Sequence, residues 1–126
     1  MSDQFKITLA QLNATVGDLN GNAEKVIKAW GKARDDRSNL VAFPELFVTG
    51  YNPQDLILKP AFQKASADTI KKIAKACSPG PAIAVGGPFC DQENLYNAYY
   101  ILFEGKIQAI IKKHHLPNEE VFDEVR

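Results

Sequence analysis

Leu40-Val-Ala-Phe-Pro-Glu-Leu-Phe-Val-Thr-Gly-Tyr51 is the stretch from which the fold of this chain can be worked out. Its first four residues, 40–43, are apolar and predict a short buried strand. Pro44 ends that strand, because proline has no backbone N–H to donate to a sheet. Glu45 follows among apolar neighbours, so its carboxylate is either paired or has a raised pKa, which would suit a general base. A surface glutamate in an ordinary loop is the alternative interpretation of this segment.

The residues before this stretch predict a strand, a helix and a parallel pairing. Residues 5–13 begin with alternating apolar side chains, as in a strand. Apolar residues then recur at helical spacing over 23–33, with Trp30 expected in the core, and Asn20 or Asn22 is the expected N-cap. A strand, a helix and a strand joined by short links predict two parallel strands with a right-handed crossover.

The residues after this stretch predict a second helix and three more strands. The helix is expected over 62–77 and is broken by Ser78-Pro-Gly-Pro81. The strands are expected at 82–85, closed by a turn at Gly86-Gly87-Pro88, and at 96–103 and 106–112, joined as a hairpin by Glu104-Gly105. The sequence therefore predicts an α/β fold with an antiparallel piece. Two helices cannot cover both faces of about five strands, so we expect a fragment of something larger, or half of an intimate assembly.

Composition narrows the function classes. Lys+Arg and Asp+Glu both number 15, and a net charge of zero argues against nucleic acid as the main partner. No apolar run reaches the roughly 20 residues of a membrane span, so no membrane partner is expected. The N-terminus lacks a signal-peptide pattern. Two cysteines, Cys77 and Cys90, make no disulfide framework, so a reduced, cytoplasmic setting is the default.

Lys112-Lys113-His114-His115-Leu116-Pro117-Asn118 is the second informative stretch. Ligands collect at strand ends in open α/β sheets, and Glu45 and Lys113 each follow or end a predicted strand. Such a pair can move protons, because the lysine stabilises an oxyanion while the glutamate accepts a proton. A solvated, basic strand end is the plainer interpretation. The adjacent His114 and His115 face opposite ways in a strand, so no metal site is expected.

Together, the stretches 43–51 and 112–118 resemble the nitrilase/carbon–nitrogen hydrolase superfamily. Four further features are similar to the glutaminase domain of glutamine-dependent NAD⁺ synthetase: Ala10-Gln-Leu-Asn13, Gly50-Tyr-Asn-Pro-Gln-Asp-Leu56, Leu95-Tyr-Asn-Ala98, and Leu116-Pro-Asn118 followed by Val121-Phe-Asp-Glu-x-Arg126. The resemblance covers essentially the whole chain. It implies an α-β-β-α sandwich of the nitrilase type, of which only the N-terminal half is present in residues 1–126.

The resemblance also implies a Glu-Lys-Cys triad. Glu45 matches the general base and Lys113 the catalytic lysine, with Lys112 as the less favoured neighbour. Tyr51 matches a position near the glutamine pocket, and Glu124 an acidic residue that supports the lysine. In such enzymes the cysteine attacks glutamine to give a thioester and ammonia, and water then releases glutamate. The ammonia passes to a second domain, where ATP and Mg²⁺ serve the amidation of nicotinic acid adenine dinucleotide to NAD⁺.

The chain departs from the family pattern in three ways. The family nucleophile lies beyond the lysine by more residues than this chain has, and neither Cys77 nor Cys90 stands in its motif. The ATP-binding synthetase domain is also absent. Glu119-Glu120 occupies the place where relatives usually carry Tyr-Gly. We therefore expect residues 1–126 alone to be inactive and to need no cofactor. The implied partners are L-glutamine, the missing C-terminal part of the enzyme, and further copies in a homo-oligomer.

Two other functions stay open at this stage. One is another amidohydrolase of the superfamily, such as an amidase or carbamoylase, with the same glutamate and lysine. The other is a non-catalytic nitrilase-like module that associates through its bare sheet face.

Overall fold

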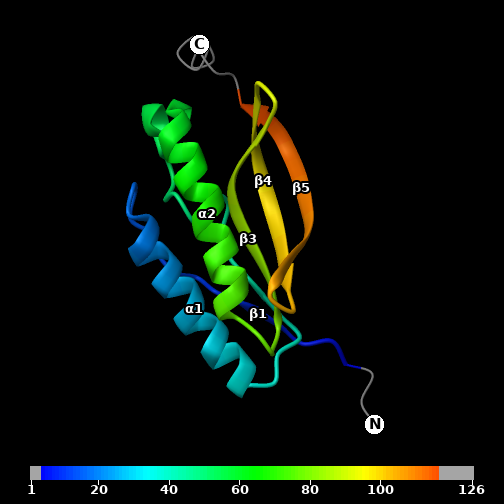
Figure 1. Ribbon diagram of the computed structural model, residues 1–126. Helices are drawn as coiled ribbons and strands as arrows, with labels where there is room; N and C mark the ends of the chain where they lie inside the picture. The colour runs from blue at the N-terminus through cyan, green and yellow to red at the C-terminus, as the bar shows by residue number, and fades with distance from the viewer. Residues whose placement is uncertain (1–3, 117–126) are drawn as a thin grey trace.

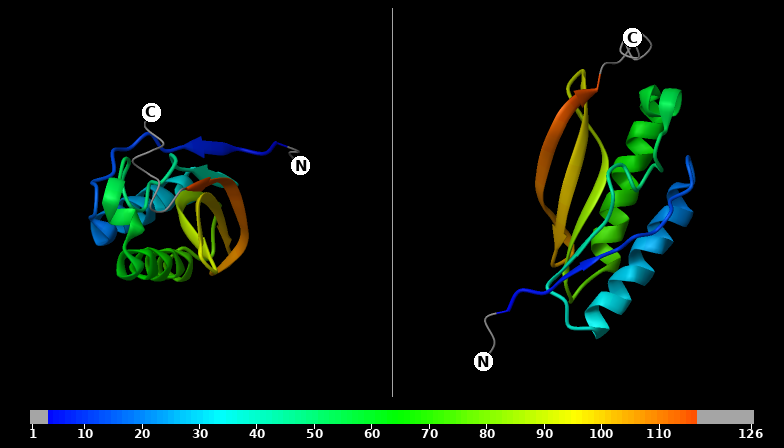
Figure 2. Two further views of the ribbon diagram at one scale, coloured as in Figure 1. Left: turned by 90° about the horizontal axis from the view of Figure 1, so that it is seen from above. Right: turned by 180° about the vertical axis from the view of Figure 1, so that it is seen from behind.

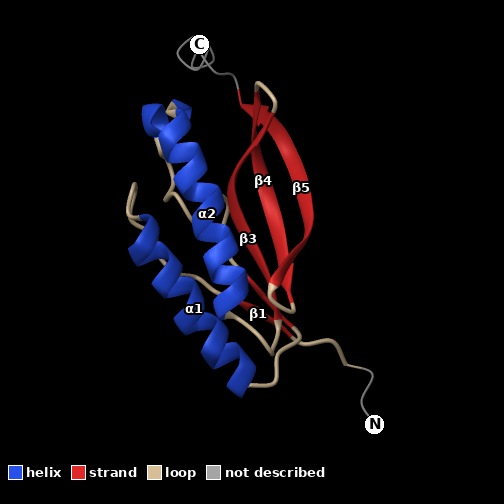
Figure 3. Cartoon of the chain, viewed as in Figure 1, coloured by secondary structure: helices blue, strands red, loops and turns tan. Residues whose placement is uncertain are grey.

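The computed structural model of the protein describes residues 4–116, which form one five-stranded sheet in the order β1-β2-β3-β4-β5. Helices α1 (Leu19–Asp35) and α2 (Pro60–Ala76) lie side by side on one side of that sheet (Figure 1, and Figure 2, left). The strands, red in Figure 3, are β1 (Ile7–Leu9), β2 (Leu40–Ala42), β3 (Ala82–Asp91), β4 (Asn94–Phe103) and β5 (Lys106–Leu116). A short 3₁₀ helix, η1, spans Gln54–Leu58.

The strand pairings confirm the predicted α/β fold. β1, β2 and β3 pair in parallel, and β3, β4 and β5 pair antiparallel. The predicted hairpin turn is also confirmed, because Glu104 and Gly105 join β4 to β5 with φ values of 54° and 81°. The segment between β1 and β2 contains α1, as expected for a parallel crossover.

The predicted N-cap of α1 is wrong. Asp18 caps the helix, because its Oδ1 accepts a hydrogen bond from the Gly21 N–H at 2.9 Å. Asn22 is fully buried instead, and its Nδ2 donates to the carbonyls of Thr15 at 2.8 Å and Val48 at 3.0 Å. Asn22 therefore ties α1 to the segment that follows Glu45.

The turn predicted at Gly86-Gly87-Pro88 is also wrong, since these residues lie inside β3. Gly86 pairs with Tyr99 and Gly87 with Ala98, and Cys90 belongs to the same strand. β2 pairs with β3 only as far as Ala84, so beyond it β3 has a partner strand on one side. A proline is tolerated at such an edge because the missing N–H breaks no ladder on the open side.

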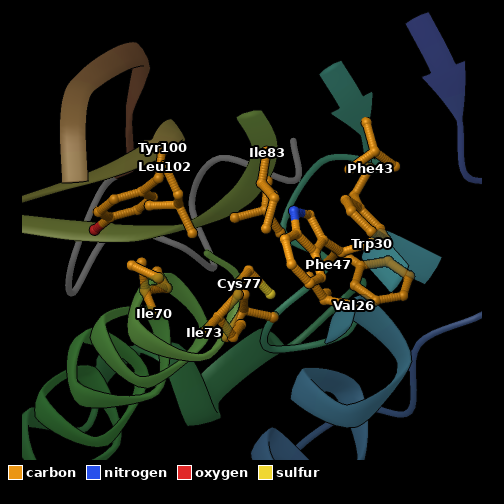
Figure 4. Close-up of a cluster of buried hydrophobic side chains, with 14 of the residues drawn as sticks. Val26, Trp30, Phe43, Phe47, Ile70, Ile73, Cys77, Ile83, Tyr100 and Leu102 are labelled. Carbon is orange, nitrogen blue, oxygen red and sulfur yellow. The ribbon is translucent and has the colours of Figure 1, made fainter. Parts of the chain in front are cut away.

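The hydrophobic core lies between the two helices and the inner face of the sheet. Figure 4 shows side chains of both helices meeting those of β3 and β4 and two phenylalanines of the segment after β2. Trp30 is 4% exposed, which confirms its predicted place in the core, and its Nε1 donates to the Pro81 carbonyl at 2.9 Å. The core includes Val26, Trp30, Phe43, Phe47, Ile70, Ile73, Ile83, Tyr100 and Leu102.

The opposite, outer face of the sheet is apolar and lies away from both described helices. The register places one row of small and apolar side chains across the strands: Leu9, Ala42, Ala84, Ile101 and Ala109. Ile7 and Leu9 are 50% and 70% exposed, and Ile111 on β5 is 51% exposed. This arrangement confirms the expectation that one face would lack a helical cover.

The packing of the core predicts that alanine substitutions at two neighbouring residues of α2 will differ greatly in their effect on the free energy of unfolding. Ile73 is 0% exposed, whereas Lys72 is exposed. We expect Ile73→Ala to lower the free energy of unfolding by about 2–5 kcal/mol, because it leaves a cavity in the core. Lys72→Ala should change it by less than about 0.5 kcal/mol. Denaturant unfolding of the two variants tests this, and equal effects would contradict the packing described.

Candidate functional site

The segment that carries Glu45 is anchored on both sides of it. The Phe43 N–H donates to the Ala84 carbonyl at 2.8 Å, and the Val48 N–H donates to the Gly86 carbonyl at 3.1 Å. Phe43 and Phe47 are buried, and their ring centroids lie 5.4 Å apart. Because these neighbours are fixed in the core, the backbone at Glu45 has little freedom, while its side chain is still 35% exposed.

Gly86 allows this segment to lie directly on the sheet. A Cβ built at position 86 would lie 2.3 Å from the Leu46 nitrogen and 2.9 Å from the Pro44 oxygen. Both atoms belong to the backbone, so neither can turn aside as a side chain would. The place of Glu45 over β3 therefore depends on the absence of a side chain at Gly86.

Lys113 reaches Glu45 from a β-bulge in β5. Lys112 pairs with Ala98 and His114 pairs with Asn97, so Lys113 is an extra residue between two adjacent pairs. A bulge of this kind changes the direction of a side chain relative to a regular strand. The Lys113 Nζ lies 2.5 Å from Glu45 Oε2, and both side chains are 35% exposed. The predicted proximity is confirmed, although Lys113 lies within β5 rather than at its end.

The pair shifts both pKa values in the direction that keeps it ionised. The hydrogen bond from Lys113 holds the pKa of Glu45 below its ordinary value, against the opposing effect of burial, with further help from Asn97 and from the charges of Lys113 and His114. The same hydrogen bond raises the pKa of Lys113, and burial opposes that rise. Of the two possibilities that the sequence left for Glu45, the structure has the paired carboxylate.

Tyr99 on β4 supports both members of the pair. Its hydroxyl donates to the Phe43 carbonyl at 3.1 Å, and its ring centroid lies 5.2 Å from the Lys113 Nζ. Asn97, two residues earlier on β4, is 2% exposed and helps to hold the pKa of Glu45 below its ordinary value. Sequence reasoning missed Gly86, Tyr99 and Asn97 as parts of this site. The Leu95-Tyr-Asn-Ala98 motif was the available signal for Asn97.

The other predicted site residues are exposed, paired with a different residue, or outside the described chain. Tyr51 is 67% exposed in the loop before η1, and Glu124 lies outside the described residues. Lys112, the less favoured candidate, forms an ion pair with Asp91 instead. Its Nζ lies 3.1 Å from Asp91 Oδ2 and 4.9 Å from the Tyr96 ring centroid.

Neither cysteine lies beside the pair. Cys77 is buried in the core, where burial raises the pKa of its thiol to about 11. Cys90 is exposed, and its Sγ donates to the Gln92 carbonyl at 3.4 Å. Cys90 is four positions along β3 from Gly86, roughly 13 Å at the rise of an extended strand. Across residues 4–116, no three histidine, cysteine or acidic side chains come together as metal ligands.

Neither helix in residues 4–116 is long and apolar enough to cross a membrane. The family model described as carbon-nitrogen hydrolase matches residues 6–126. The chain belongs to the carbon–nitrogen hydrolase family.

Two relatives in this family are glutamine-dependent NAD⁺ synthetases. The one from Rhodobacter capsulatus is 49% identical over 126 residues, which are 100% of this chain and 23% of that protein. The one from Aquifex aeolicus is 44% identical over 123 residues, 97% of this chain and 21% of that protein. The chain thus spans about a fifth of the length of these relatives.

Solved structures support the nitrilase-type fold. A glutamine-dependent NAD⁺ synthetase from Cytophaga hutchinsonii matches with a TM-score of 0.82 at 25% identity, over 91% of this chain and 20% of that one. An amidase from Nesterenkonia sp. matches with a TM-score of 0.75 at 24% identity, over 93% of this chain and 46% of that one. The five-stranded sheet with its two helices is therefore a nitrilase-type α/β arrangement of the size of an N-terminal part.

Alanine substitutions at two adjacent glycines of β3 test whether the Glu45 segment lies against that strand. We expect Gly86→Ala to lower the free energy of unfolding by about 1–3 kcal/mol, because the new Cβ collides with backbone atoms. Gly87→Ala is the matched control, since its Cβ would lie 2.9 Å from the Ile70 Cδ1, the end of a side chain that can move. Unfolding measurements on both variants test the expectation. A Gly86 variant no less stable than the Gly87 variant would contradict it.

The stabilisation from the Glu45–Lys113 pair should depend on pH at both extremes. Ionised Glu45 contributes fully above its ordinary pKa of 4.5, and this contribution is lost as pH falls through the lowered folded value. Charged Lys113 contributes fully below 10.5, and its contribution is lost as pH rises through the raised folded value. The difference in Tm between the protein and Lys113→Met should thus be constant between about pH 5 and 10 and shrink outside that range.

The exposed pair of Lys64 and Asp68, 3.0 Å apart, provides the matched control for that experiment. Lys64→Met removes one surface charge without touching the site. If the Lys113 variant follows the same pH dependence as the Lys64 variant, the described effect of the pair on stability is contradicted.

Proposed function

We propose that residues 1–126 are the N-terminal part of a glutamine-hydrolysing domain of the nitrilase type, with Glu45 and Lys113 as catalytic residues. The observation that carries the proposal is the contact between these two side chains, which are 68 positions apart in the sequence. The family match and the similarity to glutamine-dependent NAD⁺ synthetases support it.

Each of the two residues has a distinct task in this proposal. Glu45 is held as a carboxylate by its lowered pKa, so it is ready to accept the proton of an attacking thiol. Lys113 keeps its proton because its pKa is raised, so it donates a hydrogen bond to the oxyanion that forms on the substrate carbonyl. The proton on Glu45 then passes to the leaving nitrogen, which departs as ammonia and leaves a thioester. Water hydrolyses the thioester to glutamate and restores the thiol.

The attacking thiol comes from outside residues 1–126 in this proposal. Cys77 is a buried core thiol and Cys90 is displaced along β3, so neither serves the pair. The apolar outer face of the sheet, including Ile7, Leu9 and Ile111, is the surface on which the remaining part of the domain packs as a second sheet. We expect residues 1–126 without that part to hydrolyse no glutamine.

The names of the relatives suggest the wider setting. In this proposal the released ammonia serves a glutamine-dependent NAD⁺ synthetase, in which ATP and Mg²⁺ act in a separate synthetase domain. Tyr51 lies at the glutamine pocket and Glu124 supports Lys113. The parent enzyme is cytoplasmic and homo-oligomeric. The chain itself is proposed to bind no cofactor.

Glutamine hydrolysis by a protein in which residues 1–126 are joined to the rest of the domain tests the assigned roles. We expect Glu45→Gln and Lys113→Met each to lower kcat/KM by at least about a hundredfold, because each removes a proton-transfer or oxyanion group. Lys112→Met, which breaks the contact with Asp91, is the matched control and should stay within about threefold. Ammonia release is the measurement.

Three results would count against the proposal. Turnover of simple aliphatic amides without turnover of glutamine would favour the amidase alternative. Full activity in the Glu45→Gln variant would remove its role as the base. Ammonia release by residues 1–126 alone, abolished by Cys90→Ser, would show that the thiol is in this chain.

A further inference from the structure

Tyr99 on β4 contacts both the lysine of the ion pair and the segment that carries the glutamate. Its hydroxyl donates to the Phe43 carbonyl at 3.1 Å, and the Lys113 Nζ lies over its ring, 5.2 Å from the centroid. Its backbone pairs with Gly86 of β3, the glycine against which the segment after β2 lies. One side chain therefore joins two parts of the site that are far apart in the sequence.

The ring of Tyr99 is held at both of its ends. Its backbone belongs to the middle of β4, which has a partner strand on each side, and the side chain is half-buried. The hydroxyl at the far end donates to a backbone carbonyl of Phe43, which is only 3% exposed. A tyrosine has two rotatable side-chain bonds, so these contacts leave it little freedom. Lys113, in contrast, is a flexible side chain that is 35% exposed.

The attraction between Lys113 and this ring does not depend on the charge of Glu45. The ion pair needs an ionised carboxylate, and in the proposed function Glu45 becomes neutral when it accepts the proton of the thiol. An aromatic ring attracts a cation through its quadrupole, which stays the same when a nearby acid is protonated. Without the ring, the flexible Lys113 would be free to turn toward water at the stage when the oxyanion needs its ammonium group.

We propose that Tyr99 is a positioning residue for Lys113, and that its ring keeps the ammonium group at the site while Glu45 is protonated. This inference rests on the proposed function. Tyr99 acts through Lys113, which is the residue that donates to the oxyanion. Its effect falls on the chemical step, because ionised Glu45 already holds Lys113 when glutamine binds.

The same strand carries a second pair of this kind, which serves as the matched control. Tyr96 is half-buried, as Tyr99 is, and the Lys112 Nζ lies over its ring, 4.9 Å from the centroid. That lysine pairs with Asp91. The two pairs thus share residue types, strand and exposure, and only one of them includes a lysine that contacts Glu45.

The first test measures glutamine hydrolysis by a protein in which residues 1–126 are joined to the rest of the domain. We expect Tyr99→Leu to lower kcat by about fivefold to thirtyfold with KM changed little, because the ring is needed only after Glu45 is protonated. Tyr99→Phe keeps the ring and should retain kcat within about threefold. Tyr96→Leu should also stay within about threefold.

A fluorinated ring separates electrostatic attraction from packing. Trifluorophenylalanine at position 99 keeps nearly the shape of phenylalanine, but its fluorines withdraw electrons from the face of the ring. It should therefore lower kcat relative to Tyr99→Phe, as Tyr99→Leu does. It also provides the test if Tyr99→Leu does not fold. A role in packing alone predicts that phenylalanine and its fluorinated analogue are equally active.

The second test needs no turnover. Glu45→Gln places a neutral side chain of nearly the same shape at the site, in the manner of a protonated glutamate. An aromatic ring shifts the NMR signals of protons over its face upfield. The Cε proton signals of Lys113, assigned with Lys113→Met, should stay shifted in Glu45→Gln and should return to the ordinary lysine position when Tyr99→Leu is added.

The possible results separate this inference from the proposed function. Equal kcat for Tyr99→Phe and the fluorinated ring, or an unshifted Lys113 signal in Glu45→Gln, would overturn the positioning role even if the protein hydrolyses glutamine. A Tyr99→Phe variant as slow as Tyr99→Leu would also overturn it, because the hydroxyl would then carry the effect. Absence of glutamine hydrolysis in the unsubstituted protein would instead overturn the proposed function, and the positioning role would fall with it. A lower kcat with KM preserved, together with the shifted signal, supports the inference.

Discussion

The close contact between the Pro44–Leu46 backbone and Gly86 is the constraint on which the site depends. It lets a segment that leaves the sheet after β2 cross back over β3, where it meets β4 and β5. Phe43 and Phe47 hold the two sides of that segment in the core, so the one polar residue between them points away from it. The position of Glu45 is thus set by packing, and its charge is then met by groups from two other strands.

The electrostatics of the site follow from the way in which packing places Glu45. The ion pair is about one-third exposed, so the protein does not bear the full cost of burying two charges. Two neighbours on β4 adjoin the pair: the Tyr99 hydroxyl donates to the Phe43 carbonyl, and the Asn97 side chain is 2% exposed. Proton transfer to a substrate needs an ion pair that the substrate can reach and that rigid neighbouring residues hold in place.

The sequence predicted those features whose causes are local. The break at Pro44, the amphipathic helices and the hairpin at Glu104-Gly105 all follow from residues adjacent to them. The Gly86-Gly87-Pro88 segment was misread as a turn because its turn propensity is overridden by pairing with β4, which is a non-local interaction. Asn97 and Tyr99 were missed for a related reason. Nothing in residues 95–100 indicates that the loop after β2 will lie against them.

The bulge in β5 has a consequence for how two neighbouring lysines differ. Lys112 and Lys113 are identical in chemistry, yet one is matched with Asp91 and the other with Glu45. The distinction is made by strand length, since one residue inserted or removed on either side of the bulge would exchange their directions. Which lysine reaches Glu45 therefore depends on the number of residues in the strand. Two related chains can share the Lys-Lys dipeptide and still present different ammonium groups to the carboxylate.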